Sequence, residues 1–185
     1  MLIARQKKEE NIAEYMLYMY QVEDVIRAYD FNLDRIINEF VRPQLPDTSF
    51  LDQYRSWYEE LILEMKSEKI VESGHLLRLQ EVLVELSYLH NSLLNILKDE
   101  KYKTLYEAAG EHIEEFKEHS NLKDRNHVEI CFQALYMKLL LRLQKKEISQ
   151  ETEDSFDSMR ILLAYLSRAY HQMRNGDGQY WNNWL

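Results

Sequence analysis

Apolar residues along this chain recur every three or four positions over long stretches, which is the spacing of an amphipathic α-helix. Both prolines, Pro43 and Pro46, lie in one connector, where they interrupt any helix because proline lacks a backbone donor. The pattern predicts long helices over residues 8–29, 48–71, 75–98, 101–118, 126–146 and 150–174, and a shorter helical piece over residues 33–41.

The connectors between these segments indicate how the helices are arranged. "KDEK", "HSNLKD" and "KEISQ" are short, and short connectors favour antiparallel neighbours. Four glycines among 185 residues are too few for a protein built from many hairpins, and 45% hydrophobic residues are too many for a disordered chain. We therefore predict an all-α, single-domain antiparallel bundle of about six long helices over residues 1–185.

Two of the predicted helices are apolar on two sides. In residues 75–98 the main face carries leucines, while Leu77, Val84 and Tyr88 form a second patch on the opposite side, which predicts a central helix. In residues 126–146 a second apolar arc must meet another helix or another subunit. This arc consists of Ile130, Met137 and Leu141, which are candidate interaction residues.

The first helix contains the stretch "EYMLYMYQVED", residues 14–24, whose tyrosines and methionines form a wide apolar surface. Glu23 falls on this surface, and burial would raise the pKa of its carboxyl. Such a glutamate can act as a general acid or base. Alternatively it forms a structural pair with Arg27 one turn later, or with a tyrosine hydroxyl.

His90 takes the place of a leucine in the apolar series of residues 75–98, so its imidazole is expected to point inward. A buried histidine can serve as a base, a ligand or a proton-dependent switch, or it can be a neutral core residue with one hydrogen-bond partner. Glu23 is a candidate partner for it. The sequence thus gives three buried polar candidates, Glu23, Arg27 and His90, and a testable Glu23–His90 contact.

Other patterns of catalytic or metal-binding residues are weak. His112, Glu115 and His119 share one side of a helix, but three such residues on a charged helix arise easily by chance. The single Glu-x-x-His, ending at His75, is not repeated as a di-iron site requires. Cys131 is expected inside a helix, where its thiol is inert. We predict no metal and no cofactor.

The net charge and the search for targeting signals limit which partners and which cellular location are expected. A net charge of −9 without a basic cluster argues against nucleic acid as a partner. The N-terminal "MLIARQKKEEN" has no signal-peptide core, and no run of about 18 apolar residues suggests a membrane span. With a single cysteine there is no disulfide framework. A cytoplasmic protein is expected.

The C-terminal residues 175–185 differ in composition from the rest of the chain. Glycines are expected to end the last helix, and Tyr180, Trp181 and Trp184 then place a large aromatic area on a short tail. Such a tail packs on its own bundle as a lid, or it docks on a second subunit or a partner.

Three segments, "ARQKKEENIAEYMLYMYQVEDVIRAY", "ESGHL" and "LSYLHNSLL", together resemble a bacterial family from Bacteroidetes-type organisms that is known only as a domain of unknown function. The resemblance spans most of the chain. It implies an all-helical cytoplasmic protein and brings with it no catalytic or binding residues.

Two functional hypotheses follow. The first is an interaction or scaffold protein, not an enzyme, that associates with itself through the second arc of residues 126–146 and through the aromatic tail. The second is a small-molecule-binding protein or enzyme with an internal polar site around Glu23 and His90.

Overall fold

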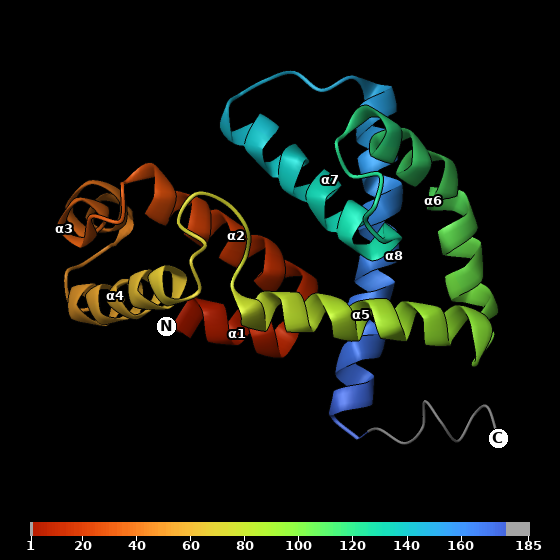
Figure 1. Ribbon diagram of the computed structural model, residues 1–185, viewed down its shortest axis with the longest axis horizontal. Coiled ribbons are helices and arrows are strands. Elements are labelled where there is room, and N and C mark those ends of the chain that lie inside the picture. Colours follow the sequence, from red (N-terminus) through yellow and green to blue (C-terminus); the bar gives the residue numbers. More distant parts are fainter. Residues whose placement is uncertain (1, 177–185) are drawn as a thin grey trace.

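The computed structural model describes residues 2–176, and nearly all of them are helical (Figure 1). The α-helices are α1 (Leu2–Glu10), α2 (Ile12–Ala28), α3 (Leu33–Arg35), α4 (Leu51–Ser67), α5 (Leu77–Asn95), α6 (Glu100–His119), α7 (His127–Leu143) and α8 (Gln150–Arg174). A π-helix, η1 (Ile36–Val41), and a 3-10 helix, η2 (Arg42–Gln44), lie between α3 and α4. The all-α prediction is confirmed, with eight α-helices in residues 2–176 rather than six.

The predicted first helix, residues 8–29, is divided in the structure at Asn11. The Asn11 side chain accepts hydrogen bonds from the backbone N–H groups of Ala13 and Glu14, at 3.0 and 3.2 Å, and so caps the start of α2. Ser167 of α8 donates a further hydrogen bond to the same Asn11 oxygen, at 2.8 Å. Asparagine is a preferred N-cap residue, so the sequence carried this signal, but the apolar periodicity continues across it.

The helices cross one another, and contacts join both consecutive helices and helices that are distant in the chain (Figure 1). The longest helix, α8, lies between α6 and α7 along one half of its length and contacts α2 and α5 along the other (Figure 1). The first part of α4 packs on α3 and η1, away from α8 (Figure 1). Consecutive helices from α5 to α8 do contact one another, as the short connectors predict, and α8 in addition packs on α2 and α5, which are distant from it in sequence.

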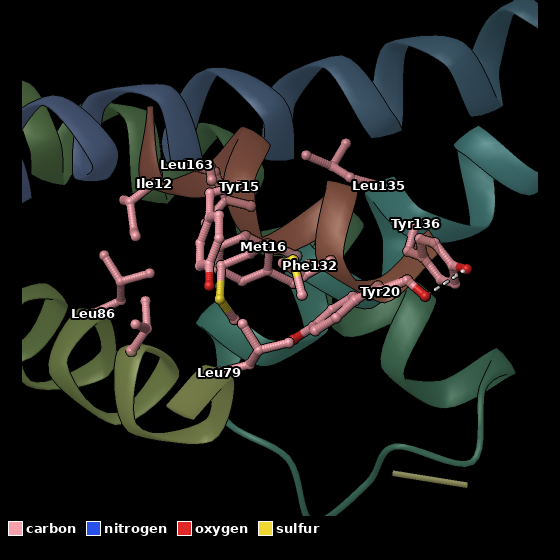
Figure 2. Close-up of a cluster of buried hydrophobic side chains, with 14 of the residues drawn as sticks. Ile12, Tyr15, Met16, Tyr20, Leu79, Leu86, Phe132, Leu135, Tyr136 and Leu163 are labelled. Carbon is pink, nitrogen blue, oxygen red and sulfur yellow. Dashed lines mark hydrogen bonds between the residues drawn. The ribbon is translucent and has the colours of Figure 1, made fainter. Parts of the chain in front are cut away.

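The centre of the core is where α2, α5, α7 and α8 meet (Figure 2). Burying each large apolar side chain there contributes about 1.5–3 kcal/mol to folding. The side chains in this cluster include Ile12, Tyr15, Met16, Leu79, Leu86, Phe132, Leu135 and Leu163, all of them buried. The inward-facing surface predicted for the "EYMLYMYQVED" helix is thus an actual core surface.

The second apolar patch of α5 faces solvent, so the prediction that both sides of this helix are buried is wrong. The exposed fractions of Leu77, Val84 and Tyr88 are 56%, 69% and 69%. We call these three residues the α5 outer face. Its high exposure means that no described helix packs over it, although Val84 also borders the pocket between α5 and α7.

Replacing Val84 with alanine is expected to change the free energy of unfolding by less than about 0.5 kcal/mol, and in the stabilising direction. The side chain is exposed, and alanine favours the helix more than valine does. Urea denaturation measures this change. The matched variant Val82→Ala, at a buried position two residues earlier, must lower the urea midpoint. A clear loss of unfolding free energy in Val84→Ala would show that a partner covers the α5 outer face.

The second arc predicted for residues 126–146 is divided between the core and the surface. Ile130 is fully buried within its own chain and is not available to a partner. Leu141 is half-buried, and Met137 is 46% exposed. The remaining interaction candidates, Tyr180, Trp181 and Trp184, lie outside the described residues.

Candidate functional site

Glu23 of α2 is fully buried and caps a different helix. Its Oε1 accepts a hydrogen bond of 2.9 Å from the backbone N–H of Leu76, the residue that precedes α5. In a capping box the side chain at N3 accepts this N-cap N–H, but Leu79 occupies N3 of α5 and has no acceptor, so the carboxylate of α2 supplies it. A negative charge at this position also interacts favourably with the N-terminal end of the α5 dipole.

The second carboxylate oxygen of Glu23 holds His75. The distance between Glu23 Oε2 and His75 Nδ1 is 2.6 Å. The imidazole stacks on the ring of Tyr20, with 3.7 Å between the ring centroids. A carboxylate oxygen accepts a hydrogen bond at this distance from an Nδ1–H group, and Nε2 is the other polar atom of the ring. The His75 side chain remains 27% exposed.

The loop that carries His75 is held against α2 by hydrogen bonds from Arg27. Gly74 has φ = +94°, a conformation that favours glycine and allows the chain to turn into α5. One turn of α2 after Glu23, the Arg27 guanidinium donates hydrogen bonds to the carbonyl oxygens of Ile70, at 3.2 Å, and of Gly74. Two successive turns of α2 therefore fix the position of the imidazole.

His75 forms part of the wall of a pocket between α5, α7 and the two loops that precede them. The pocket has a volume of about 690 Å³. Its lining combines polar residues, Ser73, His75, Gln80, Ser87, Arg125, Asn126, Glu129 and Gln133, with the larger apolar side chains of Tyr20, Leu83, Val84 and Leu122. Arg125 and Glu129 form an ion pair at 2.9 Å. The pocket thus offers both hydrogen-bond donors and acceptors around one oriented imidazole.

His90 is buried as predicted, but its partner is Tyr102 and not Glu23. The distance between His90 Nδ1 and the Tyr102 hydroxyl is 2.7 Å. Glu23 lies beside Leu76 at the start of α5, and His90 is about 21 Å further along the helix axis at 1.5 Å per residue. The predicted Glu23–His90 contact is therefore wrong. Burial in an apolar site, with a smaller effect from His127, lowers the pKa of His90 to about 4.

Arg27 is the third buried polar candidate, and it does not pair with Glu23. Its guanidinium forms an ion pair with Asp24 at 2.9 Å, besides its bonds to the loop carbonyls. Asp24 also accepts a hydrogen bond of 2.5 Å from the Tyr136 hydroxyl, which in turn lies near the Tyr20 carbonyl (Figure 2). Burial, followed by this bond to Asp24, raises the pKa of Tyr136. These contacts join α2 to α7 beside the pocket.

A comparison with known protein families found a match that spans almost the whole chain. Residues 1–177 match the family described as Domain of unknown function (DUF4924). The chain belongs to this family. No curated protein and no solved structure matches the DUF4924 chain.

Other candidate sites of this DUF4924 chain are less organised. Among residues 2–176, no group of three histidine, cysteine or acidic side chains is placed to hold a metal ion. His112, from the weak cluster on α6, bonds the Ser155 hydroxyl of α8 at 3.0 Å. Cys131 is buried, and burial raises the pKa of its thiol to about 12. In the same part of the chain, no helix is long and apolar enough to cross a membrane.

Sequence reasoning missed His75 as the partner of Glu23 in this DUF4924 site. It considered His75 only as the end of a Glu-x-x-His pattern. A usable signal was present, since a buried glutamate needs donors, and the residues around a helix start supply unsatisfied backbone N–H groups. The loop histidine beside Gly74, directly before a helix without a capping side chain, met that requirement.

Proposed function

We propose that this DUF4924 protein binds a small polar ligand in the pocket between α5 and α7, with the Glu23–His75 pair as the orienting contact. The observation that carries the proposal is the fully buried carboxylate of Glu23 behind a partly exposed imidazole on the pocket wall. A buried charge costs folding energy, so an acid that holds a pocket-lining side chain in one orientation is typical of functional sites.

The pocket suits a ligand in the usual size range. Its volume of about 690 Å³ lies within the range of roughly 300–1,000 Å³ that is typical of small-molecule sites. The amides of Gln80 and Gln133 and the hydroxyl of Ser73 line it together with the Arg125–Glu129 pair. Such a lining matches ligands that carry several hydroxyl or amino groups.

Nε2 of His75 is the ring atom that is available to a ligand, because Nδ1 bonds Glu23. In the tautomer that carries its single proton on Nδ1, Nε2 accepts a hydrogen bond, so the proposed ligand presents an O–H or N–H group to it. A carboxylate behind a histidine is also the arrangement that orients a general base. Proton abstraction from a bound hydroxyl is therefore the chemistry for which this site is equipped.

The proposal is tested with the variant His75→Ala and a panel of sugars, polyols and amino alcohols screened by ligand-observed NMR. The wild-type protein is expected to bind at least one compound of this panel. The loss of one hydrogen bond of about 0.5–1.5 kcal/mol is expected to weaken the binding of that compound to His75→Ala by roughly two- to tenfold.

The matched control is His119→Ala, at an exposed histidine that is not among the residues lining the α5–α7 pocket, which must leave affinity unchanged. The proposal fails if no compound of the panel binds the wild-type protein at millimolar concentration. It also fails if His75→Ala binds the same compound as tightly as the wild-type protein does.

A second candidate function is self-association or a scaffold role through the α5 outer face. Leu77, Val84 and Tyr88 are exposed and lie along one side of α5, where apolar residues at helical spacing suit a second helix. Light scattering after size exclusion tests it: a dimer that Tyr88→Glu converts to a monomer supports this role, and a monomeric wild-type protein contradicts it. We assign either role to the cytoplasm, because Cys131 is a free thiol.

A further inference from the structure

A second pocket lies on the opposite side of α2, between that helix, the η1–η2 segment and α4. Its volume is about 220 Å³. Four aromatic side chains surround it, Tyr18, Phe40, Tyr54 and Tyr58, and Ile3 of α1 lies at its edge. Among the described residues that line it, none carries a charge. In this it differs from the α5–α7 pocket, whose lining includes the charged residues Arg125 and Glu129.

The wall of this pocket includes an irregular segment of backbone. Residues 36–41 form a π-helix, and a 3-10 turn containing Pro43 follows it directly. π-helices are rare and are frequently found at functional sites, because their irregular turn costs stability. Ile36 and Ile37 anchor this turn in the core, with exposed fractions of 0% and 4%, while Phe40 and Val41 line the pocket. The irregular turn is thus firmly held and shapes the cavity.

The aromatic walls are neutral at physiological pH. Burial raises the pKa of Tyr18 to about 12, and burial also raises the pKa of Tyr58. An anion would lose its hydration in this pocket without meeting a positive charge, and a cation would meet ring faces but no carboxylate among the lining residues. An uncharged ligand therefore suits this lining.

The size and the rim of the pocket specify the ligand further. A cavity of about 150 Å³ holds benzene, so this pocket accommodates one ring with a small substituent. Aromatic side chains favour edge-to-face or offset stacking with such a ring. At the exposed rim, the Gln44 Nε2 donates a hydrogen bond of 2.7 Å to the Phe40 carbonyl, which leaves the Gln44 amide oxygen to accept one from a ligand.

We propose that the pocket between α2, η1 and α4 binds a small neutral aromatic molecule, a single ring or an indole, that carries one hydroxyl or N–H donor. The aromatic side chains pack against the ligand's ring, and the amide oxygen of Gln44 accepts a hydrogen bond from its donor group. This site is independent of the Glu23–His75 pocket.

The test uses 4-fluorophenol as the probe and follows its binding to the full-length protein by fluorine NMR. Saturable binding in the submillimolar to millimolar range is expected. The variant Val25→Trp fills the pocket from α2 and weakens binding at least tenfold. The control Leu63→Trp, on the exposed side of α4, leaves binding unchanged. His75→Ala also leaves it unchanged, which separates this site from the proposed function.

A second comparison keeps the test decisive if Val25→Trp does not fold. The wild-type protein is expected to prefer 4-fluorophenol to 4-fluoroanisole, which has the ring but no donor, and Gln44→Ala reduces this preference. The proposal is overturned if the wild-type protein does not bind the probe, or if cyclohexanol binds as tightly as phenol. Binding that emerges only after deletion of residues 177–185 also overturns it, because the chain's own tryptophans would then be the occupants.

Discussion

Glu23→Ala is expected to lower the free energy of unfolding by about 3 kcal/mol. The substitution leaves the buried N–H of Leu76 without an acceptor and removes the partner of His75 Nδ1. Leu76 is fully buried, so water cannot replace the lost bond. Urea denaturation measures the loss as a lower midpoint at an unchanged slope.

Two matched variants separate the causes of this loss. Glu23→Gln keeps one acceptor oxygen, so it is expected to lose about half as much stability. Glu59→Ala makes the same truncation at an exposed position of α4 and is expected to change stability by less than about 0.5 kcal/mol. If Glu23→Ala is as stable as Glu59→Ala, the carboxylate does not hold α2 to the start of α5.

Acidification is expected to destabilise the protein through His90. The pKa of this side chain is about 4 in the folded state, against 6.5 when it is not perturbed. Between these values the unfolded chain binds more protons than the folded one, so stability rises with pH. The contribution is fully present above about pH 6.5 and is lost as the pH falls towards 4. A pKa difference of this size corresponds to about 3 kcal/mol.

The variant His90→Asn isolates this effect. An asparagine amide can still bond the Tyr102 hydroxyl at the position of Nδ1, but it does not titrate. Free energies of unfolding, measured from pH 7 to 4.5 in both proteins, are compared by subtraction, which removes the contributions of the other titrating groups. A wild-type advantage at pH 7 that shrinks on acidification is expected. Parallel curves for the two proteins would show that His90 is accessible to protons in the folded state.

Much of the fold could be predicted from the sequence, and the candidate site could be predicted in part. The helical spacing located the inward surface of α2, and it identified Glu23 and His90 as buried polar residues. The two prolines marked the connector that η2 and the following loop occupy. The division at Asn11 and the π-helix η1 were missed, because both interrupt a periodicity that continues through them.

The sequence by itself determined the angle at which each side chain leaves its own helix, because that angle depends only on local backbone geometry. For Glu23 this was enough to predict burial. Only the tertiary structure decided what lies opposite each face: His75, 52 positions away, meets Glu23, and the α5 outer face meets solvent. Which helices cross, and where, depends on how all the apolar surfaces pack together, and no periodicity within one helix contains that information.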